Sequence, residues 1–140
     1  MFAKVVNNNK IVLCLFAFCF FMMSHICDLS AQNNQADKIL GVWLTEKKDS
    51  KIQILKKEDG NYYAKIIWTL AQYKSFEQMV IIKNLVYVPK DNEYVTPWIY
   101  SPRKKISAKA SLTLKGNILY VKATKALISV TEEFTRVTDY

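Results

Sequence analysis

The sequence has few cysteines and histidines, and all of them lie near its start. The cysteines are Cys14, Cys19 and Cys27, and the single histidine is His25. Residues beyond 27 therefore contain no thiol and no imidazole. This composition excludes a Ser-His-Asp triad, a Cys-His pair and a His-ligated zinc site there. We expect no metal, no cofactor and no disulfide in that part, so its fold must depend on packing alone.

Carboxylate chemistry is also poorly supported. Glu132 and Glu133 are adjacent, so on a strand they face opposite sides and cannot flank one scissile bond. Asp91 and Glu93 fall in a turn, where solvated charges are the simpler explanation. The sequence contains no glycine-rich phosphate loop. We therefore expect a protein that is not an enzyme.

The first residues read as a leader for export. Lys4 and Lys10 give a positive start, and an unbroken apolar run covers 11–23. That run is too short for a bilayer, which needs roughly twenty apolar residues, so no stable transmembrane anchor is expected. The small residue Ala31 fits a cleavage position. The pattern predicts a signal peptide over 1–31 and one mature domain over 32–140, periplasmic or secreted.

A lipid anchor at Cys27 is the alternative for the leader. A lipoprotein signal requires a small residue directly before its cysteine, whereas the bulky Ile26 stands there. Cleavage near Ala31 is therefore the preferred prediction, with a lipoprotein at Cys27 as the minor one.

Acidic residues are fewer than basic ones. The chain has 20 Lys and Arg against 12 Asp and Glu, and removal of 1–31 leaves 18 against 11, a net +7. Export argues against nucleic acid as the partner. Anionic surfaces of the cell envelope are available partners instead. The alternative is that the lysines only keep the domain soluble, because they alternate with apolar residues along the chain.

Alternation of apolar and polar residues dominates after residue 40 and indicates β-strands. Asp59-Gly60 between two such runs is a hairpin signal, and Pro97 argues for an edge strand or a bend. No long amphipathic helix is present. Short strands at close spacing predict an all-β fold, a small antiparallel up-and-down barrel of about eight strands. The expected strands cover 40–45, 51–58, 62–70, 79–88, 94–101, 107–114, 118–124 and 130–137.

A Gly-x-Trp motif opens the first expected strand, and an arginine lies on the last. Gly41, Trp43 and Arg136 form this pair of features, which resembles the closure of calycins such as lipocalins and fatty-acid-binding proteins. In those barrels a cation from the last strand packs over the indole. The resemblance implies a lipocalin-like barrel in which these three residues have a structural role.

A second resemblance covers nearly the whole mature chain. The segment 38–58, Ile82-Lys83-Asn84-Leu85, the run 99–102 and the closing run 131–137 are similar to the secreted bacterial family called domain of unknown function 2147. Ala64 stands where that family usually has Gly, and Phe134 replaces a Trp. The resemblance implies an exported barrel-like domain and brings no established activity.

Binding is the function that these patterns favour. An eight-stranded barrel is wide enough to be filled by side chains or to hold one small ligand. We expect a non-catalytic barrel that binds a small apolar or amphipathic ligand. The candidate ligand-binding residues are aromatic or charged residues of the expected strands: Tyr63, Trp68, Tyr94, Trp98, Glu132 and Phe134.

Alternatives remain for these residues. The aromatic side chains could form a plain core, and Glu132 could pair with Arg136 inside the barrel, since buried charges need partners. The whole domain could instead be a filled barrel that contacts an envelope protein or an anionic surface, for example through the basic loop Arg103-Lys104-Lys105.

Overall fold

A computed structural model describes residues 34–138 of the chain. The expected signal peptide, its cleavage near Ala31 and the alternative lipid site at Cys27 lie outside the described residues. The compact unit that contains all strands begins at Lys38. No helix in the described part is long and apolar enough to cross a bilayer.

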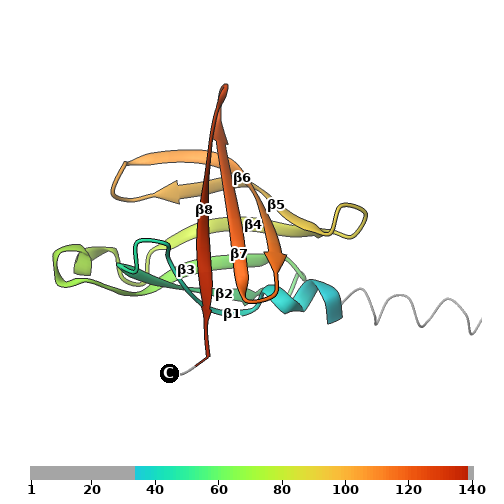
Figure 1. Ribbon diagram of the computed structural model, residues 1–140, viewed down its shortest axis with the longest axis horizontal. Helices are drawn as coiled ribbons and strands as arrows, with labels where there is room; N and C mark the ends of the chain where they lie inside the picture. Colours follow the sequence, from blue (N-terminus) through green and yellow to red (C-terminus); the bar gives the residue numbers. More distant parts are fainter. Residues whose placement is uncertain (1–33, 139–140) are drawn as a thin grey trace, which may run out of the picture. The chain divides into compact units, whose positions relative to one another are not determined.

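Eight antiparallel strands close into a barrel in which each strand pairs with its neighbours in sequence and β8 pairs with β1 (Figure 1). The prediction of an all-β, eight-stranded, up-and-down barrel is therefore confirmed. Two short 3-10 helices accompany the strands. The elements are η1 Asp37–Ile39, β1 Gly41–Leu44, β2 Ser50–Lys56, β3 Tyr62–Thr69, η2 Ala71–Phe76, β4 Val80–Val88, β5 Glu93–Ser101, β6 Ile106–Lys115, β7 Ile118–Lys125 and β8 Ile128–Val137.

Alternate residues of each strand face the barrel interior, as a pleated sheet requires. On β6, β7 and β8 the register Leu112↔Val121↔Glu132 places three side chains in one inward-facing row. The rows nearest Trp43 hold large apolar side chains and form the core. Its largest fully buried members are Trp43, Tyr94, Ile39, Ile52, Ile54, Ile82, Leu85, Leu112 and Leu119.

Register shifts occur in three strand pairs of the sheet, and those in two of them decide where candidate site residues point. Between β2 and β3 the pairing shifts after Lys51, because β3 has one extra residue there. Trp68 therefore opposes Lys51, while Ile66 opposes Ile52. In β5 the pairing shifts between Thr96 and Ile99, the segment that contains Pro97. Pro97 thus lies in a bulge, which agrees with the predicted bend. It does not mark an edge strand, because the closed barrel has no edges.

The connections fall into two groups at the two ends of the barrel. We call base the end with the connections 57–61, 89–92 and 116–117, and mouth the end with 45–49, 70–79, 102–105 and 126–127. The base turns place Gly60, Asn92 and Gly116 at positive φ, where these residue types fit well. Each mouth connection instead places a residue with a Cβ atom and no such preference at positive φ: Lys48, Gln78, Lys105 and Ala126.

Candidate binding site at the mouth of the barrel

The base of the barrel is sealed where the first and last strands meet. Arg136 pairs in register with Trp43, and its guanidinium lies 4.2 Å from the centre of the indole ring. The guanidinium also donates to the carbonyl of Leu40 at 2.8 Å, while Trp43 Nε1 donates to the carbonyl of Ile39 at 3.0 Å. A Cβ on Gly41 would lie 3.0 Å from the guanidinium, so glycine allows this close approach.

Above the base, the interior is filled by packed apolar and aromatic side chains. Tyr94 is fully buried, opposes Leu112, and meets Tyr62 edge to face with ring centres 6.0 Å apart. Phe134 is also buried and opposes Leu119 on β7. Tyr94 and Phe134 therefore belong to the core and form the floor beneath any site at the mouth.

Toward the mouth, the inner face of the barrel becomes progressively exposed. Along β8 the inward-facing residues change from Phe134, 5% exposed, to Val130, 47%, and Ile128, 72%. The residues that oppose this segment on β7 and continue the row on β6 are small: Ala123 and Ala110. An apolar inner surface with small side chains, accessible to solvent, is the arrangement expected where a small ligand enters.

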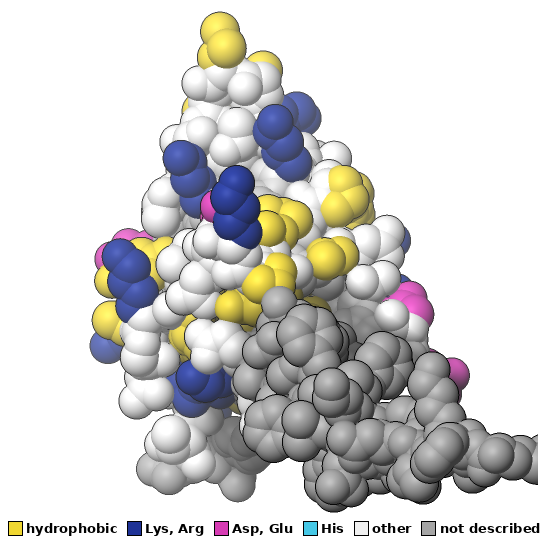
Figure 2. Space-filling model, turned by 90° about the vertical axis from the view of Figure 1, so that its right-hand side faces the viewer, with side chains coloured by type: hydrophobic (Ala, Val, Ile, Leu, Met, Phe, Trp, Pro, Cys, Tyr) yellow, Lys and Arg dark blue, Asp and Glu magenta, His cyan; other side chains and the backbone are white. Residues whose placement is uncertain are grey.

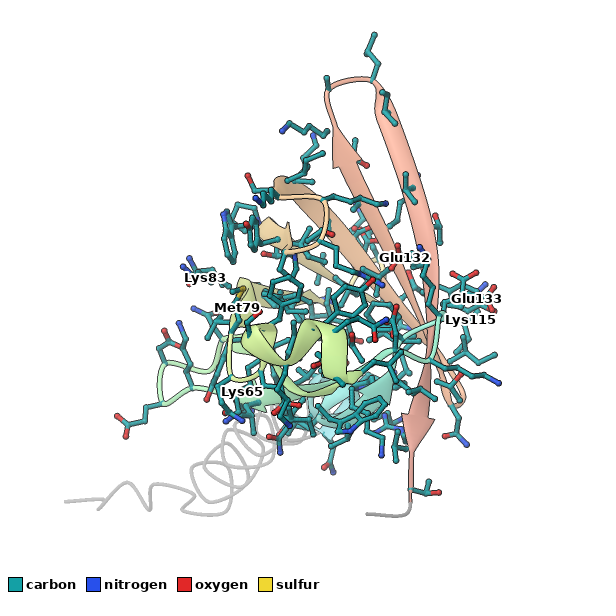
Figure 3. All side chains as sticks on the ribbon, turned by 90° about the vertical axis from the view of Figure 1, so that its left-hand side faces the viewer. Lys65, Met79, Lys83, Lys115, Glu132 and Glu133 are labelled. Carbon is teal, nitrogen blue, oxygen red and sulfur yellow. The ribbon has the colours of Figure 1, made fainter. Side chains whose placement is uncertain are left out.

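Glu132 is the one acidic residue on the inward-facing row of β8. It opposes Val121 and lies between Phe134 and Val130 on the same face. Figure 3 shows Glu132 and Glu133 on opposite sides of β8. Among residues 34–138, Glu132 has neither a hydrogen-bond partner nor an ion-pair partner, and the expected Glu132–Arg136 pair is not formed. Arg136 lies two residues closer to the base, where Trp43 and backbone carbonyls occupy it.

A second polar group near the mouth lacks a partner. Thr69 ends β3, is 4% exposed, and opposes Ser50. Its Oγ1 is buried without a hydrogen bond to any residue in 34–138, although its backbone N–H donates to Glu77 Oε1 at 3.0 Å. An unmade hydrogen bond of a buried hydroxyl costs free energy, so such groups often mark a site for water or a ligand.

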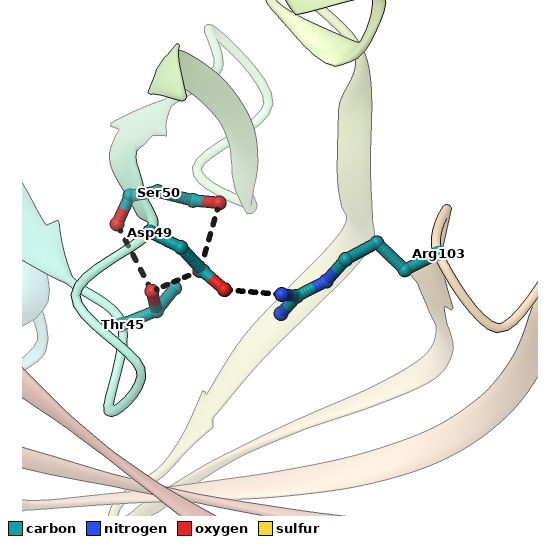
Figure 4. A network of polar contacts seen from close by, with 4 residues as sticks. All are labelled: Thr45, Asp49, Ser50 and Arg103. Carbon is teal, nitrogen blue, oxygen red and sulfur yellow. Dashed lines mark hydrogen bonds and ion pairs between the residues drawn. The ribbon is translucent and has the colours of Figure 1, made fainter. Parts of the chain in front are cut away.

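A polar network joins two mouth connections (Figure 4), and a cation–π contact adds a third. Arg103 of the β5–β6 connection forms an ion pair with Asp49 of the β1–β2 connection. Thr45 and Ser50 donate hydroxyl hydrogen bonds to the same carboxylate at 3.0 and 3.2 Å. The Arg103 guanidinium lies 5.2 Å from the ring centre of Tyr73 in η2. Since β1–β2 and β5–β6 are four strands apart in a ring of eight, this contact spans the mouth.

The electrostatics of this network favour the charged form of Asp49. Burial alone would raise the pKa of the Asp49 carboxyl group. The hydrogen bonds from Thr45 and Arg103, the charge of Arg103 and the bond from Ser50 together outweigh burial and lower that pKa. The guanidinium of Arg103 is therefore held by Asp49 at one side of the mouth.

Three candidate ligand-binding residues lie on the outer face. Tyr63 opposes Leu55 one position away from the inward-facing Tyr62 and Ala64. Trp68, beyond the β3 bulge, lies 5.8 Å from the Lys51 ammonium group. Trp98, in the β5 bulge region, stacks on Tyr100 with ring centres 5.8 Å apart. These three side chains therefore lie apart from the inward-facing Tyr94, because the bulges in β3 and β5 reverse the alternation before Trp68 and Trp98, and Tyr63 follows an inward-facing neighbour.

The structure adds site residues that the sequence did not single out: Thr69, Asp49, Ala110 and Ala123. The alternation in 107–114 and 118–124 contained a signal for the alanines, since small residues stand there at inward positions. A scan against protein-family models and searches of curated proteins and of solved structures found no significant match. The resemblances described above remain predictions, and the geometry alone carries the functional argument.

Proposed function

We propose that this protein binds, without catalysis, a small amphipathic molecule at the mouth of the barrel. The single observation that carries the proposal is the Glu132 carboxylate, unpartnered among residues 34–138 and flanked by the apolar Val130 and Phe134 on the inner face of β8. A carboxylate flanked by apolar side chains is costly to desolvate unless a partner arrives. The ligand class that fits has an aliphatic body and a cationic or hydrogen-bond-donating head.

The aliphatic body has a surface to bind. Val130, Ala123 and Ala110 form one inward-facing row across β8, β7 and β6. Phe134 and Tyr94 close the interior below that row, so a short alkyl chain at the mouth would rest on their rings. Thr69 Oγ1 is a second group at the mouth that can accept or donate a hydrogen bond.

The place of action belongs to the same proposal. The leader pattern in 1–31 directs the chain to the periplasm or the outside of the cell. The proposed role is therefore that of an exported carrier or sensor of a small amphipathic compound. The alternative is a filled barrel that contacts an envelope protein or an anionic surface, and the solvent-exposed aliphatic tip of the β7–β8 hairpin favours it.

Native mass spectrometry of the exported protein, purified from its own cell envelope, tests the proposal. A stoichiometric adduct, identified after organic extraction, is the expected result. A clean apo mass, together with no thermal shift across a panel of lipids and metabolites, would contradict ligand binding and favour the filled barrel.

The role of Glu132 has its own test with a matched control. Decylamine and decanoate are compared as probes, and we expect the amine to bind more tightly. Glu132→Gln keeps the shape and removes the charge, so amine affinity should fall by about tenfold or more. Glu133→Gln makes the same change on the outer face of β8 and should leave affinity unchanged. Equal binding of both probes, or unchanged binding by Glu132→Gln, would exclude this role.

A further inference from the structure

The β7–β8 hairpin ends in an exposed aliphatic tip. Lys125 opposes Ile128, so the turn itself is Ala126-Leu127. Leu127 is fully exposed, and Ile128 is 72% exposed. Figures 1 and 2 show the hairpin projecting beyond the other strands and hydrophobic side chains at its apex. A lone exposed leucine is ordinary, whereas neighbouring aliphatic residues at the end of a protruding hairpin indicate a contact surface.

The charges nearest this tip are basic. Between Glu93 and Glu132 the sequence contains no acidic residue and seven basic ones. Six are exposed lysines with no ion pair among residues 34–138: Lys104, Lys105, Lys109, Lys115, Lys122 and Lys125. Lys115 lies at the base, whereas Lys122 and Lys125 lie on β7 of the hairpin itself. Figure 2 shows Lys and Arg side chains on both sides below the apex. The tip therefore combines an apolar end with an unneutralised basic collar.

The turn is not built for local stability. Two-residue hairpin turns favour Gly or Asn at positions with positive φ, whereas here Ala126 holds φ 54. Leu127 gains no packing in the described structure, since it is fully exposed. Ala126 is unfavourable for the turn, and Leu127 adds no buried area to the fold. Neither residue is explained by the stability of the barrel, whereas a contact with an external surface would explain Leu127.

We propose that the hairpin tip docks the protein on an anionic phospholipid bilayer. Leu127 and Ile128 would enter the boundary between headgroups and acyl chains, and the lysine collar would lie at the level of the lipid phosphates. Aliphatic side chains at the apex, with flexible lysines behind them, suit a bilayer in which a charged headgroup layer covers a fluid apolar layer. They offer few directional groups for a specific protein partner. This proposal does not rest on ligand binding. Its central residue, Leu127, lies in the turn, and only Ile128 also belongs to the inward-facing side of β8.

Vesicle binding of the exported protein tests the proposal. Vesicles of phosphatidylglycerol and phosphatidylcholine in equal parts are compared with vesicles of phosphatidylcholine alone. We expect binding to the anionic vesicles, weakened by salt. Leu127→Ser should reduce that binding by about tenfold or more, since it removes a buried leucine from the contact. Each of Lys122→Gln and Lys125→Gln should reduce it by about fivefold.

Matched variants distinguish binding through the hairpin tip from binding that depends only on overall charge or on any exposed apolar side chain. Val86→Thr changes an aliphatic residue that is 42% exposed on β4, and Lys90→Gln changes an exposed lysine of a base turn. Both should bind vesicles as the parent does. Equal binding to neutral vesicles, or the same loss in Val86→Thr as in Leu127→Ser, would overturn the proposal.

A fluorescent label gives a second readout that folding defects do not mimic. The sequence has no cysteine beyond residue 27, so Leu127→Cys offers one site in the processed chain for an environment-sensitive dye. Its emission should shift to the blue on anionic vesicles, and a label at Val86→Cys should not. No shift at position 127, or capture of an acidic protein that is lost in Leu127→Ser without vesicle binding, would exclude the bilayer as the partner.

Discussion

The Arg103 guanidinium and the Asp49 carboxylate form an ion pair between connections that lie 54 positions apart in the chain. The pair joins opposite sides of the barrel mouth, and Tyr73 of η2 packs against the same guanidinium. The β7–β8 connection alone stands outside this network. Three connections of the mouth are thus held together while the fourth projects.

Replacement of Asp49 by Asn should remove one acid-dependent component of stability. The pKa of Asp49 is lowered in the fold, so the stabilisation is complete above the unfolded value, about 3.9, and is lost as pH falls through the folded pKa. At pH 7 the variant should be less stable by about 1–3 kcal/mol. Below about pH 4 the difference from the parent should shrink. Urea unfolding at several pH values measures both effects, and a constant difference across pH would refute the assignment.

Two buried threonines should respond oppositely to the same substitution. Thr69 Oγ1 has no hydrogen bond, so Thr69→Val removes an unsatisfied hydroxyl and should stabilise the apo protein by up to about 1 kcal/mol. Thr96 Oγ1 donates to the carbonyl of Lys83 and accepts from the Trp98 N–H at 3.0 Å. Thr96→Val leaves both groups unsatisfied and should cost about 1–3 kcal/mol. The denaturant midpoints of the two variants measure these changes. Equal changes would contradict the finding that Thr96, and not Thr69, makes side-chain hydrogen bonds.

A methyl group on Gly41 should weaken the seal at the base. Gly41 has φ 125, and its added Cβ would meet the Arg136 guanidinium at 3.0 Å. We expect Gly41→Ala to destabilise the barrel by about 2–3 kcal/mol. Gly60→Ala is the control, because Gly60 also has positive φ but no atom within 4 Å of its added Cβ. The control should lose only about 1 kcal/mol, and equal losses in thermal unfolding would mean that the Arg136 contact has no effect.

Glycine at position 126 should stabilise the protein. Ala126 holds φ 54 at the hairpin turn, a conformation that costs a residue with Cβ about 1 kcal/mol, and Ala126→Gly relieves it. The same substitution at Ala123, within regular β7, should instead destabilise by about 0.5–1 kcal/mol. Opposite signs in a chemical unfolding experiment support the strain at the turn, and two losses would refute it.

Strand pattern and barrel class could be predicted from the sequence because alternation is a local property. The register Leu112↔Val121↔Glu132 follows directly from alternation on each side of the Gly116 turn and the Ala126 turn. The placement of Trp68 and Trp98 could not be predicted, because each depends on one extra residue in a bulge. A bulge reverses every later side chain of its strand while leaving the composition unchanged.

The candidate site was only partly predictable for a different reason. Glu132 and Phe134 follow from the alternation of β8, whereas Asp49 and Arg103 meet through connections whose paths no local pattern specifies. The pairing of Glu132 with Arg136 was a sound electrostatic expectation. It fails because Trp43 and the carbonyl of Leu40 already hold the guanidinium.

The seam between β1 and β8 also constrains how the chain folds. It consists of three residue pairs, Val42↔Val137, Trp43↔Arg136 and Leu44↔Thr135, and these pairs are the most distant in sequence of any two strands. Closing so long a loop for so few pairs is entropically unfavourable until the intervening strands have assembled. The meander from β2 to β8 should therefore form first, and ring closure should be the last and rate-limiting event. The barrel therefore stays open until the segment around Arg136 is free to pair with β1.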